Sequence, residues 1–407
     1  MSPATTRTLR RKRFSLLGGF VTLVAAGATL LAPSTLFGAR RAPLNVPGAY
    51  VVLGTNDLGM HCMQQDFSEF MVLPPYNTLH AQVIRRGAEP DIISSTGDVT
   101  VEYSLPTNTH SADKTNFWKH ANALFGVNLA PDIGLAGHGL SGTMGPTTNR
   151  DWSAIGIPLT PINDDGREDP YPFATINVRS RNNGSVLAST QAVVPVSWEI
   201  GCNLCHGSAT ESVGHSVLAA HDRLHGTTLV NQMPVNCSSC HADPAVGAPG
   251  TPGVPYFSIA MHSSHASRLG QIQIDNACYA CHPGNRTQCL RDVHSVSGMT
   301  CISCHGDMAA VGAPTRVPWV DVPRCGSCHS RPGFEFEQPG KLFRESVGHS
   351  GVTCLACHGS PHAIGPAEHT ADNLQAQVQQ SLTGPIRSCD VCHTVQPSES
   401  FFHRRSN

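Results

Sequence analysis

One short pattern, Cys-Xaa-Xaa-Cys-His, occurs seven times in this 407-residue chain, each time after residue 201. Two thiols three residues apart can each form a thioether with a porphyrin vinyl group, and a histidine at the next position then supplies an axial ligand to the iron. The pattern therefore predicts seven covalently attached haem c groups, which we number as sites 1 to 7 in chain order. The attachment cysteines are Cys202, Cys205, Cys237, Cys240, Cys278, Cys281, Cys301, Cys304, Cys325, Cys328, Cys354, Cys357, Cys389 and Cys392. The proximal histidines of sites 1 to 7 are His206, His241, His282, His305, His329, His358 and His393.

The two other common uses of a Cys-Xaa-Xaa-Cys pair fit this chain less well. A structural zinc site needs two such pairs to complete four ligands, and a redox dithiol has no use for a histidine after every pair. With 16 cysteines and 22 histidines in the chain, chance placement would give on the order of 0.03 copies of the full pattern. Seven copies therefore indicate haem attachment.

On these motifs, and on phrases such as HSGVTCLACHGSPH in which further histidines bracket an attachment site, the chain resembles the multihaem c-type cytochromes of bacteria and some archaea. The resemblance covers residues 198–407 and leaves residues 48–196 outside. It implies a relay of closely stacked low-spin haems, usually with a second histidine on each iron. Its partners would be other redox proteins that serve as electron donor and acceptor.

Second axial ligands must come from outside the motifs, where fifteen histidines remain, ten of them after Cys202. His221 and His225 are spaced to share one face of a helix. Chain reach assigns no candidate to a particular haem. A methionine, Met233, Met261, Met299 or Met308, could replace a histidine and raise the potential of that haem. The distal candidates are His221, His225, His262, His265, His294, His349 and His362, with His215, His369 and His403 as reserves.

The first 39 residues predict export. Arg7, Arg10, Arg11, Lys12 and Arg13 form a basic region, and the mostly apolar run 14–32 follows it. This is the pattern of an export signal, with cleavage expected after residue 39, and an uncleaved segment would instead anchor the protein in the membrane. The predicted location is therefore periplasmic or extracellular. Cleavage would change the net charge from 27 − 29 = −2 to 22 − 29 = −7, a sign that disfavours nucleic-acid binding.

The rest of the chain divides near residue 198. Residues 45–197 predict an N-terminal all-β, sandwich-like domain, because strand-like stretches occur at 50–53, 78–85 and 99–105, and Asn-Gly lies between two more at 174–180 and 185–194. Residues 198–407 predict a haem-packed, mostly irregular heptahaem cytochrome domain in which porphyrins supply much of the buried apolar surface. Short helices are expected there at 216–223, 259–269 and 372–381.

Two cysteines, Cys62 and Cys289, are left over after haem attachment. In an oxidising compartment they could form a disulfide that ties the two parts together, or remain free buried thiols. Met60, His61 and Met63 surround Cys62, so this segment could also bind copper or contact a haem, although a structural turn is the simpler interpretation.

Two functions fit seven haems. The sequence favours an electron carrier with no catalytic residues, because all seven motifs end in histidine and the surplus of histidines allows every iron to be filled. In the alternative, one haem keeps an open position and the protein reduces or oxidises a small nitrogen or sulfur species. Self-assembly as a subunit of an extracellular cytochrome filament is a third possibility, since site 7 lies close to the last residue, Asn407, but site 1 comes only at Cys202.

Overall fold

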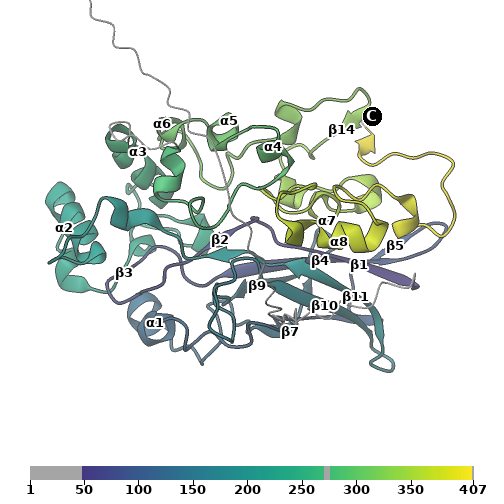
Figure 1. Ribbon diagram of the computed structural model, residues 1–407, viewed down its shortest axis with the longest axis horizontal. Coiled ribbons are helices and arrows are strands. Elements are labelled where there is room, and N and C mark those ends of the chain that lie inside the picture. Colours follow the sequence, from purple (N-terminus) through teal and green to yellow (C-terminus); the bar gives the residue numbers. More distant parts are fainter. Residues whose placement is uncertain (1–47, 270–275, 406–407) are drawn as a thin grey trace, which may run out of the picture. The chain divides into compact units, whose positions relative to one another are not determined.

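The computed structural model describes residues 48–269 and 276–405 (Figure 1). The predicted export signal or anchor, residues 1–39, lies outside the described residues. Within the described ranges, no helix combines the length and the apolar character that crossing a bilayer requires.

Two antiparallel sheets occupy the part before residue 198. Their edge strands β1 and β11 pack against each other, and strands occur at each stretch where the sequence predicts one. Strands β10 and β11 form the predicted hairpin, in which Gly184 adopts a φ of 71° that glycine reaches without strain. The first sheet contains β1 (Tyr50–Thr55), β4 (Asn77–Arg85), β9 (Trp152–Ile157) and β8 (Gly145–Pro146), with β5 (Asp91–Ile93) paired to β4. The second contains β11 (Val186–Val193), β10 (Phe173–Ser180), β6 (Val99–Ser104) and β7 (Ser141–Thr143).

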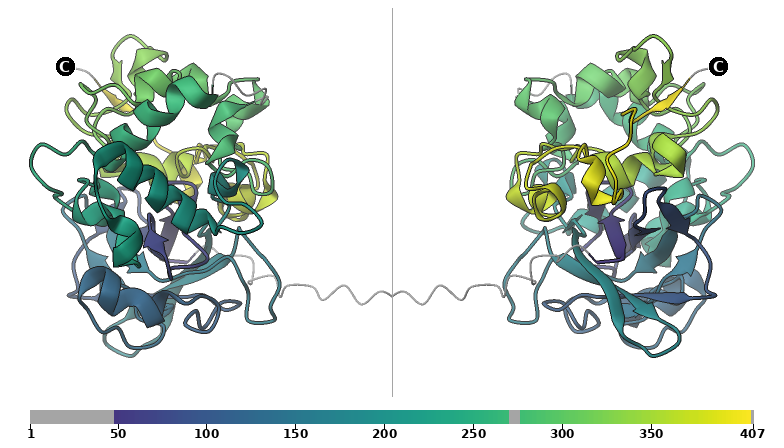
Figure 2. Two further views of the ribbon diagram at one scale, coloured as in Figure 1. Left: turned by 90° about the vertical axis from the view of Figure 1, so that its left-hand side faces the viewer. Right: turned by 90° about the vertical axis from the view of Figure 1, so that its right-hand side faces the viewer.

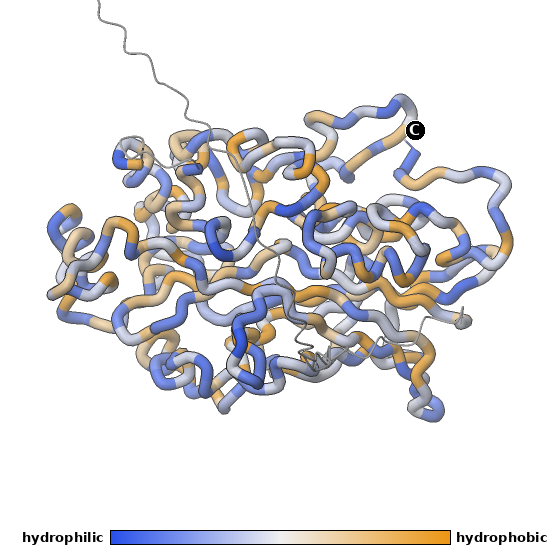
Figure 3. The backbone as a smooth tube through the Cα atoms, in the orientation of Figure 1, coloured by the Kyte–Doolittle hydropathy of each residue, from blue (hydrophilic) through white to orange (hydrophobic). Residues whose placement is uncertain are grey.

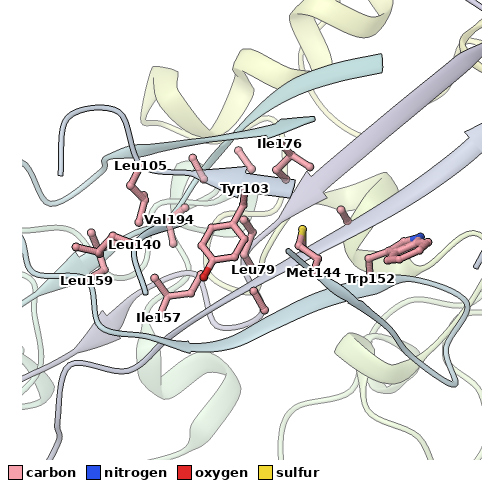
Figure 4. Packing of buried hydrophobic residues seen from close by; sticks show 14 of the residues in the cluster. Leu79, Tyr103, Leu105, Leu140, Met144, Trp152, Ile157, Leu159, Ile176 and Val194 are labelled. Atoms are coloured by element: carbon pink, nitrogen blue, oxygen red, sulfur yellow. The ribbon is translucent and has the colours of Figure 1, made fainter. Parts of the chain in front are cut away.

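One hydrophobic core fills the space between these sheets (Figure 4). Strand β6 shows how the sequence builds it, because the buried Val99, Val101 and Tyr103 alternate with half-buried polar residues. Trp152 is fully buried, and its indole N–H donates to the carbonyl of Ile93 at 2.8 Å. All fully buried members of this core precede residue 198, and hydrophobic stretches of chain follow its strands (Figure 3).

A helix, α1 (Phe117–Phe125), interrupts the β-rich part, where the sequence analysis predicts only strands. Phe117, Ala121 and Leu124 are buried along one side of it, at the spacing of an amphipathic helix. The helix ends at Gly126, which has a φ of 71°. This helical spacing of apolar residues is present in the sequence, but the helix is short and lies among strand-like stretches, so the sequence analysis did not predict it.

Beyond residue 198 the chain forms short helices and single turns joined by irregular segments. Helices occur at the three places where the sequence predicts them, as α2, α3 and α8. The helices are α2 (Val213–His225), α3 (Phe257–Leu269), α4 (Val293–Val296), α5 (Cys301–His305), α6 (Met308–Val311), α7 (Cys354–His358) and α8 (Thr370–Gln380). Most of the exposed large hydrophobic side chains of the described residues also lie in this part, among them Leu204 and Ile302 inside attachment motifs.

Contacts between strand-rich and motif-bearing residues centre on β1. Val52 enters the core between the sheets, whereas Val51 and Leu53 form a second cluster with Ala356 of α7 and with Val391. The strands and the motif-bearing helices accordingly lie in adjoining layers (Figure 2). One two-residue strand pair also joins the two parts, β3 (Phe70–Met71) with β13 (Val235–Asn236). Two further short pairs each lie within one part: β2 (His61–Cys62) with β12 (Val196–Ser197), and β14 (Phe334–Glu335) with β15 (Arg404–Arg405).

Candidate haem-attachment sites

Each Cys-Xaa-Xaa-Cys-His motif folds as a single helical turn. Sites 4 and 6 are α5 and α7, and the other five contain the short turns η1 (Gly201–Leu204), η3 (Cys237–Ser239), η5 (Ala277–Ala280), η6 (Cys325–Ser327) and η9 (Cys389–Val391). In site 1 the backbone N–H of His206 donates to the carbonyl of Cys202 at 3.0 Å, and the other four turns repeat this bond at 2.8–3.1 Å. Positions one, four and five of such a turn share one side, so both thiols and the imidazole face the same space.

Every motif histidine faces a second histidine from outside the motifs. The ring centroids are 6.0–6.3 Å apart in all seven pairs. In the order of sites 1 to 7 the pairs are His206 and His265, His241 and His221, His282 and His262, His305 and His362, His329 and His294, His358 and His403, and His393 and His349. We call the second member of each pair the facing histidine.

This spacing fits an iron ligated by both rings. Metal–imidazole nitrogen bonds of about 2.0–2.1 Å on opposite sides of an ion separate the two nitrogens by about 4 Å and the ring centres by about 6 Å. The observed centroid distances agree with that separation. A direct hydrogen bond between two rings would need nitrogens about 3 Å apart.

The facing histidines overlap largely with the candidates that the sequence suggests. His225 is the exception, because its ring lies 4.7 Å from that of His221 and faces none of the motif histidines, all of which are described. The reserve His403 faces His358 instead, at 6.0 Å. Nothing in the local sequence distinguishes His403. It reaches site 6 because β15, which includes Arg404, pairs with β14.

The Nδ1 atoms of several facing histidines are held by neighbouring groups. Carbonyl oxygens lie 2.7 Å from Nδ1 of His262 and of His265, contributed by Ser258 and Met261. The carboxylate of Asp292 lies 3.0 Å from Nδ1 of His294. A histidine that donates from Nδ1 presents the lone pair of Nε2, so these partners fix both the tautomer and the orientation of a metal-binding ring.

Burial keeps several proximal histidines neutral. Burial, with a smaller contribution from neighbouring histidines, lowers the pKa of His282, His305 and His358 to about 4 in each case. Burial likewise lowers the pKa of the facing residues His262 and His403. Neutral imidazole is the form that binds a metal, so these rings are ready to act as ligands at pH 7.

The segment around Cys62 is tied into the fold, because His61 and Cys62 form the short strand β2 that pairs with β12. Both ring nitrogens of His61 are engaged, Nδ1 with the carbonyl of Tyr76 at 2.8 Å and Nε2 with Asp57 at 3.1 Å. Met63 lies in the core between the sheets. Within the described ranges, no group of three or more His, Cys, Asp or Glu side chains is arranged to hold a bare metal ion.

Of the two spare cysteines, Cys289 lies beside His362, the facing histidine of site 4, and Cys62 lies near Cys289. Burial raises the pKa of the Cys62 thiol far above its usual range, and nearby Cys289 contributes. Sγ of Cys289 is 3.8 Å from Nδ1 of His362. Both cysteines carry free thiols in this structure, which is one of the alternatives that the sequence leaves open; the disulfide is not formed in it.

The turn of site 6 begins with a side-chain cap, which provides a stability test. Thr353 is buried, and its hydroxyl accepts from the N–H of Ala356 at 3.2 Å. We expect Thr353→Ala to lower the free energy of unfolding by about 1 kcal/mol, the usual value of such a cap. Denaturant unfolding measures this loss, and Thr353→Ser, which keeps the hydroxyl, should retain most of the stability. Equal losses in the two variants would show that the hydroxyl is not the stabilising group.

No family model matches this chain, and no curated protein or solved structure is significantly similar to it.

Proposed function

We propose that this protein is an exported multihaem c-type cytochrome that passes electrons between redox partners along seven covalently bound haems. The observation that carries the proposal is the set of seven histidine pairs, each joining a motif histidine to one facing histidine at 6.0–6.3 Å. Haem held in this way supplies a reversible one-electron couple, Fe(III)/Fe(II), with no substrate bond made or broken.

The composition of the pairs supports a carrier over an enzyme. A haem enzyme that binds its substrate at iron needs an open axial position, and the described residues place a histidine opposite each of the seven proximal ligands. All fourteen ligands come from one chain, so no site depends on a histidine from a second copy.

Packing in the second part of the chain also supports haem attachment. Among the described residues, none from beyond residue 198 is a fully buried member of the large core between the sheets, yet hydrophobic side chains such as Leu204 (57% exposed) and Ile302 (59%) lie exposed within the motifs. Porphyrin faces would bury such side chains and supply the apolar surface that this part needs to fold.

Haem content and spin state test the proposal together. We expect the purified, fully oxidised holoprotein to contain seven haems per chain and to show only low-spin ferric signals in low-temperature electron paramagnetic resonance. Counting spins against haem makes the result quantitative. A stoichiometric high-spin signal that shifts on addition of nitrite or a sulfur oxyanion would instead establish an open haem and the enzymatic alternative.

A further inference from the structure

Helix α3 joins site 1 to site 3. His265 faces His206 of site 1, and His262, three residues earlier on the same helix, faces His282 of site 3. The two attachment turns also touch directly, because the N–H of Gly201 donates to the carbonyl of Cys281 at 3.5 Å. Sites 1 and 3 are therefore neighbours, although site 2 lies between them in the sequence.

The contact between sites 1 and 3 depends on a glycine. A Cβ added at Gly201 would lie 2.0 Å from the carbonyl oxygen of Ala280, which no side chain can do without a shift of backbone. Glycine thus permits the first turn, η1, to pack against η5 of site 3.

The region of site 2 is joined to that of site 1 by α2 and by Glu69. Helix α2 begins shortly after the site 1 motif and carries His221, which faces His241 of site 2. Glu69 joins the same two regions: its carboxylate accepts from Ser212 and from the N–H of Gly214, and its carbonyl accepts from Val235 just before the site 2 motif.

The beginning of α3 places site 2 on the site 1 side of that helix. The ring of Phe257 lies 6.1 Å from His241 of site 2. At about 100° per residue, Phe257 and His265 point within about 80° of each other, and His262 points about 140° away. Around the helix axis, His265 therefore lies between Phe257 and His262, about 80° from the first and about 60° from the second, so the site 1 ligand stands between the side chain that contacts site 2 and the site 3 ligand.

Site 3 continues into site 4 through Asn276. Its side-chain oxygen accepts from the N–H of Cys278 in site 3 at 3.1 Å. The amide nitrogen of the same side chain lies 3.8 Å from Sγ of Cys301 in site 4. One amide therefore touches the first cysteine of both motifs.

Site 4 continues into site 5 through their facing histidines. The backbone of Arg291 and Val293 donates to the carbonyls of His362 and Ile364 at 2.9 and 3.1 Å. This pairing sets His362, which faces site 4, beside the segment that ends in His294, which faces site 5.

Phe336 lies between sites 5 and 6. Its ring is 6.2 Å from His329, the proximal histidine of site 5, and 4.7 Å from His403, the facing histidine of site 6. A single aromatic side chain thus contacts a ligand of each site.

Backbone contacts join site 6 to site 7. Ile386, just before the site 7 motif, donates to the carbonyl of Cys357 at 2.9 Å, and its own carbonyl lies 3.2 Å from the sulfur of that cysteine. The N–H of His349, which faces site 7, donates to the carbonyl of Phe402, the residue before His403.

We propose that the seven attachment sites form one unbranched row in the order 2, 1, 3, 4, 5, 6, 7, so that sites 2 and 7 are its two ends. This inference rests on the proposed function, because it concerns the haems that the sites would hold. It goes beyond that function by naming the places where electrons enter and leave. Redox partners should therefore meet the protein next to His241 and His393, and site 1, first in the sequence, is internal.

The direct test is an X-ray structure of the holoprotein with anomalous scattering measured at the iron edge. The row requires two close iron neighbours for site 1, those of sites 2 and 3, and a single close neighbour for sites 2 and 7. A site 2 iron whose nearest neighbour is that of site 3, or a site 1 iron at an end, would overturn the order. Fewer than seven irons per chain would overturn the proposed function instead.

A redox titration tests the same order in solution. His221→Met should raise the midpoint potential of site 2 and give that site an absorption spectrum of its own. Adding His265→Met, which raises the potential of site 1, should then lower the site 2 midpoint, because an electron already on a neighbour repels the next. His262→Met is the matched control on the same helix, and it should leave the site 2 midpoint unchanged. Any other pattern of shifts would overturn the placement of site 1 between sites 2 and 3.

Discussion

Replacing His403 with alanine is expected to convert one iron in seven from low spin to high spin. His403 faces His358 at 6.0 Å, so its removal leaves site 6 with a single protein ligand and an axial position that water can fill. The change should appear as one high-spin ferric signal per chain in electron paramagnetic resonance, with the haem content still at seven. Small ligands such as cyanide or nitric oxide should then bind at one equivalent per chain.

The matched control for this experiment is His225→Ala. His225 is exposed and, like His403, belongs to the motif-bearing part of the chain, but it faces no motif histidine. We expect its removal to leave all seven irons low-spin. A high-spin signal in this control, combined with none in His403→Ala, would reassign the facing ligand and contradict the pairing at site 6.

Breaking the buried ion pair between Arg291 and Asp372 is expected to cause a large loss of stability. Two guanidinium nitrogens of Arg291 donate to the two carboxylate oxygens at 2.7 and 2.9 Å, and the side chains are 0% and 3% exposed. The third nitrogen donates to the carbonyls of Gln288 and Cys289. Asp372→Asn leaves a buried cation without its charge partner, which typically costs about 3–5 kcal/mol.

Denaturant unfolding of the holoprotein, followed by circular dichroism, measures that cost. The control is Asp91→Asn, which removes an ion pair with Arg85 whose side chains are about half exposed, and it should cost about 0–1 kcal/mol. The double variant Arg291→Met/Asp372→Leu removes both charges and should recover part of the loss. Equal stability of Asp372→Asn and Asp91→Asn would show that the buried pair contributes no more than a surface one.

This ion pair also bears on two sites at once. Arg291 donates from its backbone to the carbonyl of His362, and it lies three residues before His294. Loss of Asp372 should therefore loosen the facing histidines of sites 4 and 5 before those of the other sites. Partial high-spin character confined to two irons is the expected spectroscopic result.

The attachment turns could be predicted from the sequence because their geometry is local. Two cysteines and a histidine at positions one, four and five fall on one side of any helical turn, whatever surrounds it. The strands could be predicted for the same reason. The alternation of apolar and polar residues in β6 and the Asn-Gly turn before Ser185 are patterns among residues close together in the chain. Helix α1 was missed because its apolar spacing is short and lies among strand-like segments.

The pairing of each facing histidine with its motif histidine depends on contacts between segments that are distant in the sequence, so it could not be predicted from the sequence. His221 and His225 share a helix face by spacing, yet the fold turns only His221 toward a motif histidine. His403 reaches site 6 through strand pairing that involves only two residues on each side. Which sites are neighbours could not be predicted from the sequence either, because contacts such as that of Gly201 with Ala280 join distant residues and have no signature in the local sequence.

The two-sided burial of β1 has a consequence for how the chain matures. Val52 has its partners within the sheets, but Val51 and Leu53 are covered by Ala356 and Val391, which come much later in the chain. Until those two residues are in place, Val51 and Leu53 leave an apolar patch on one face of the sheet exposed to solvent. A polypeptide truncated after residue 197 lacks the residues that cover this apolar patch. We therefore expect it to self-associate or precipitate when it is produced alone.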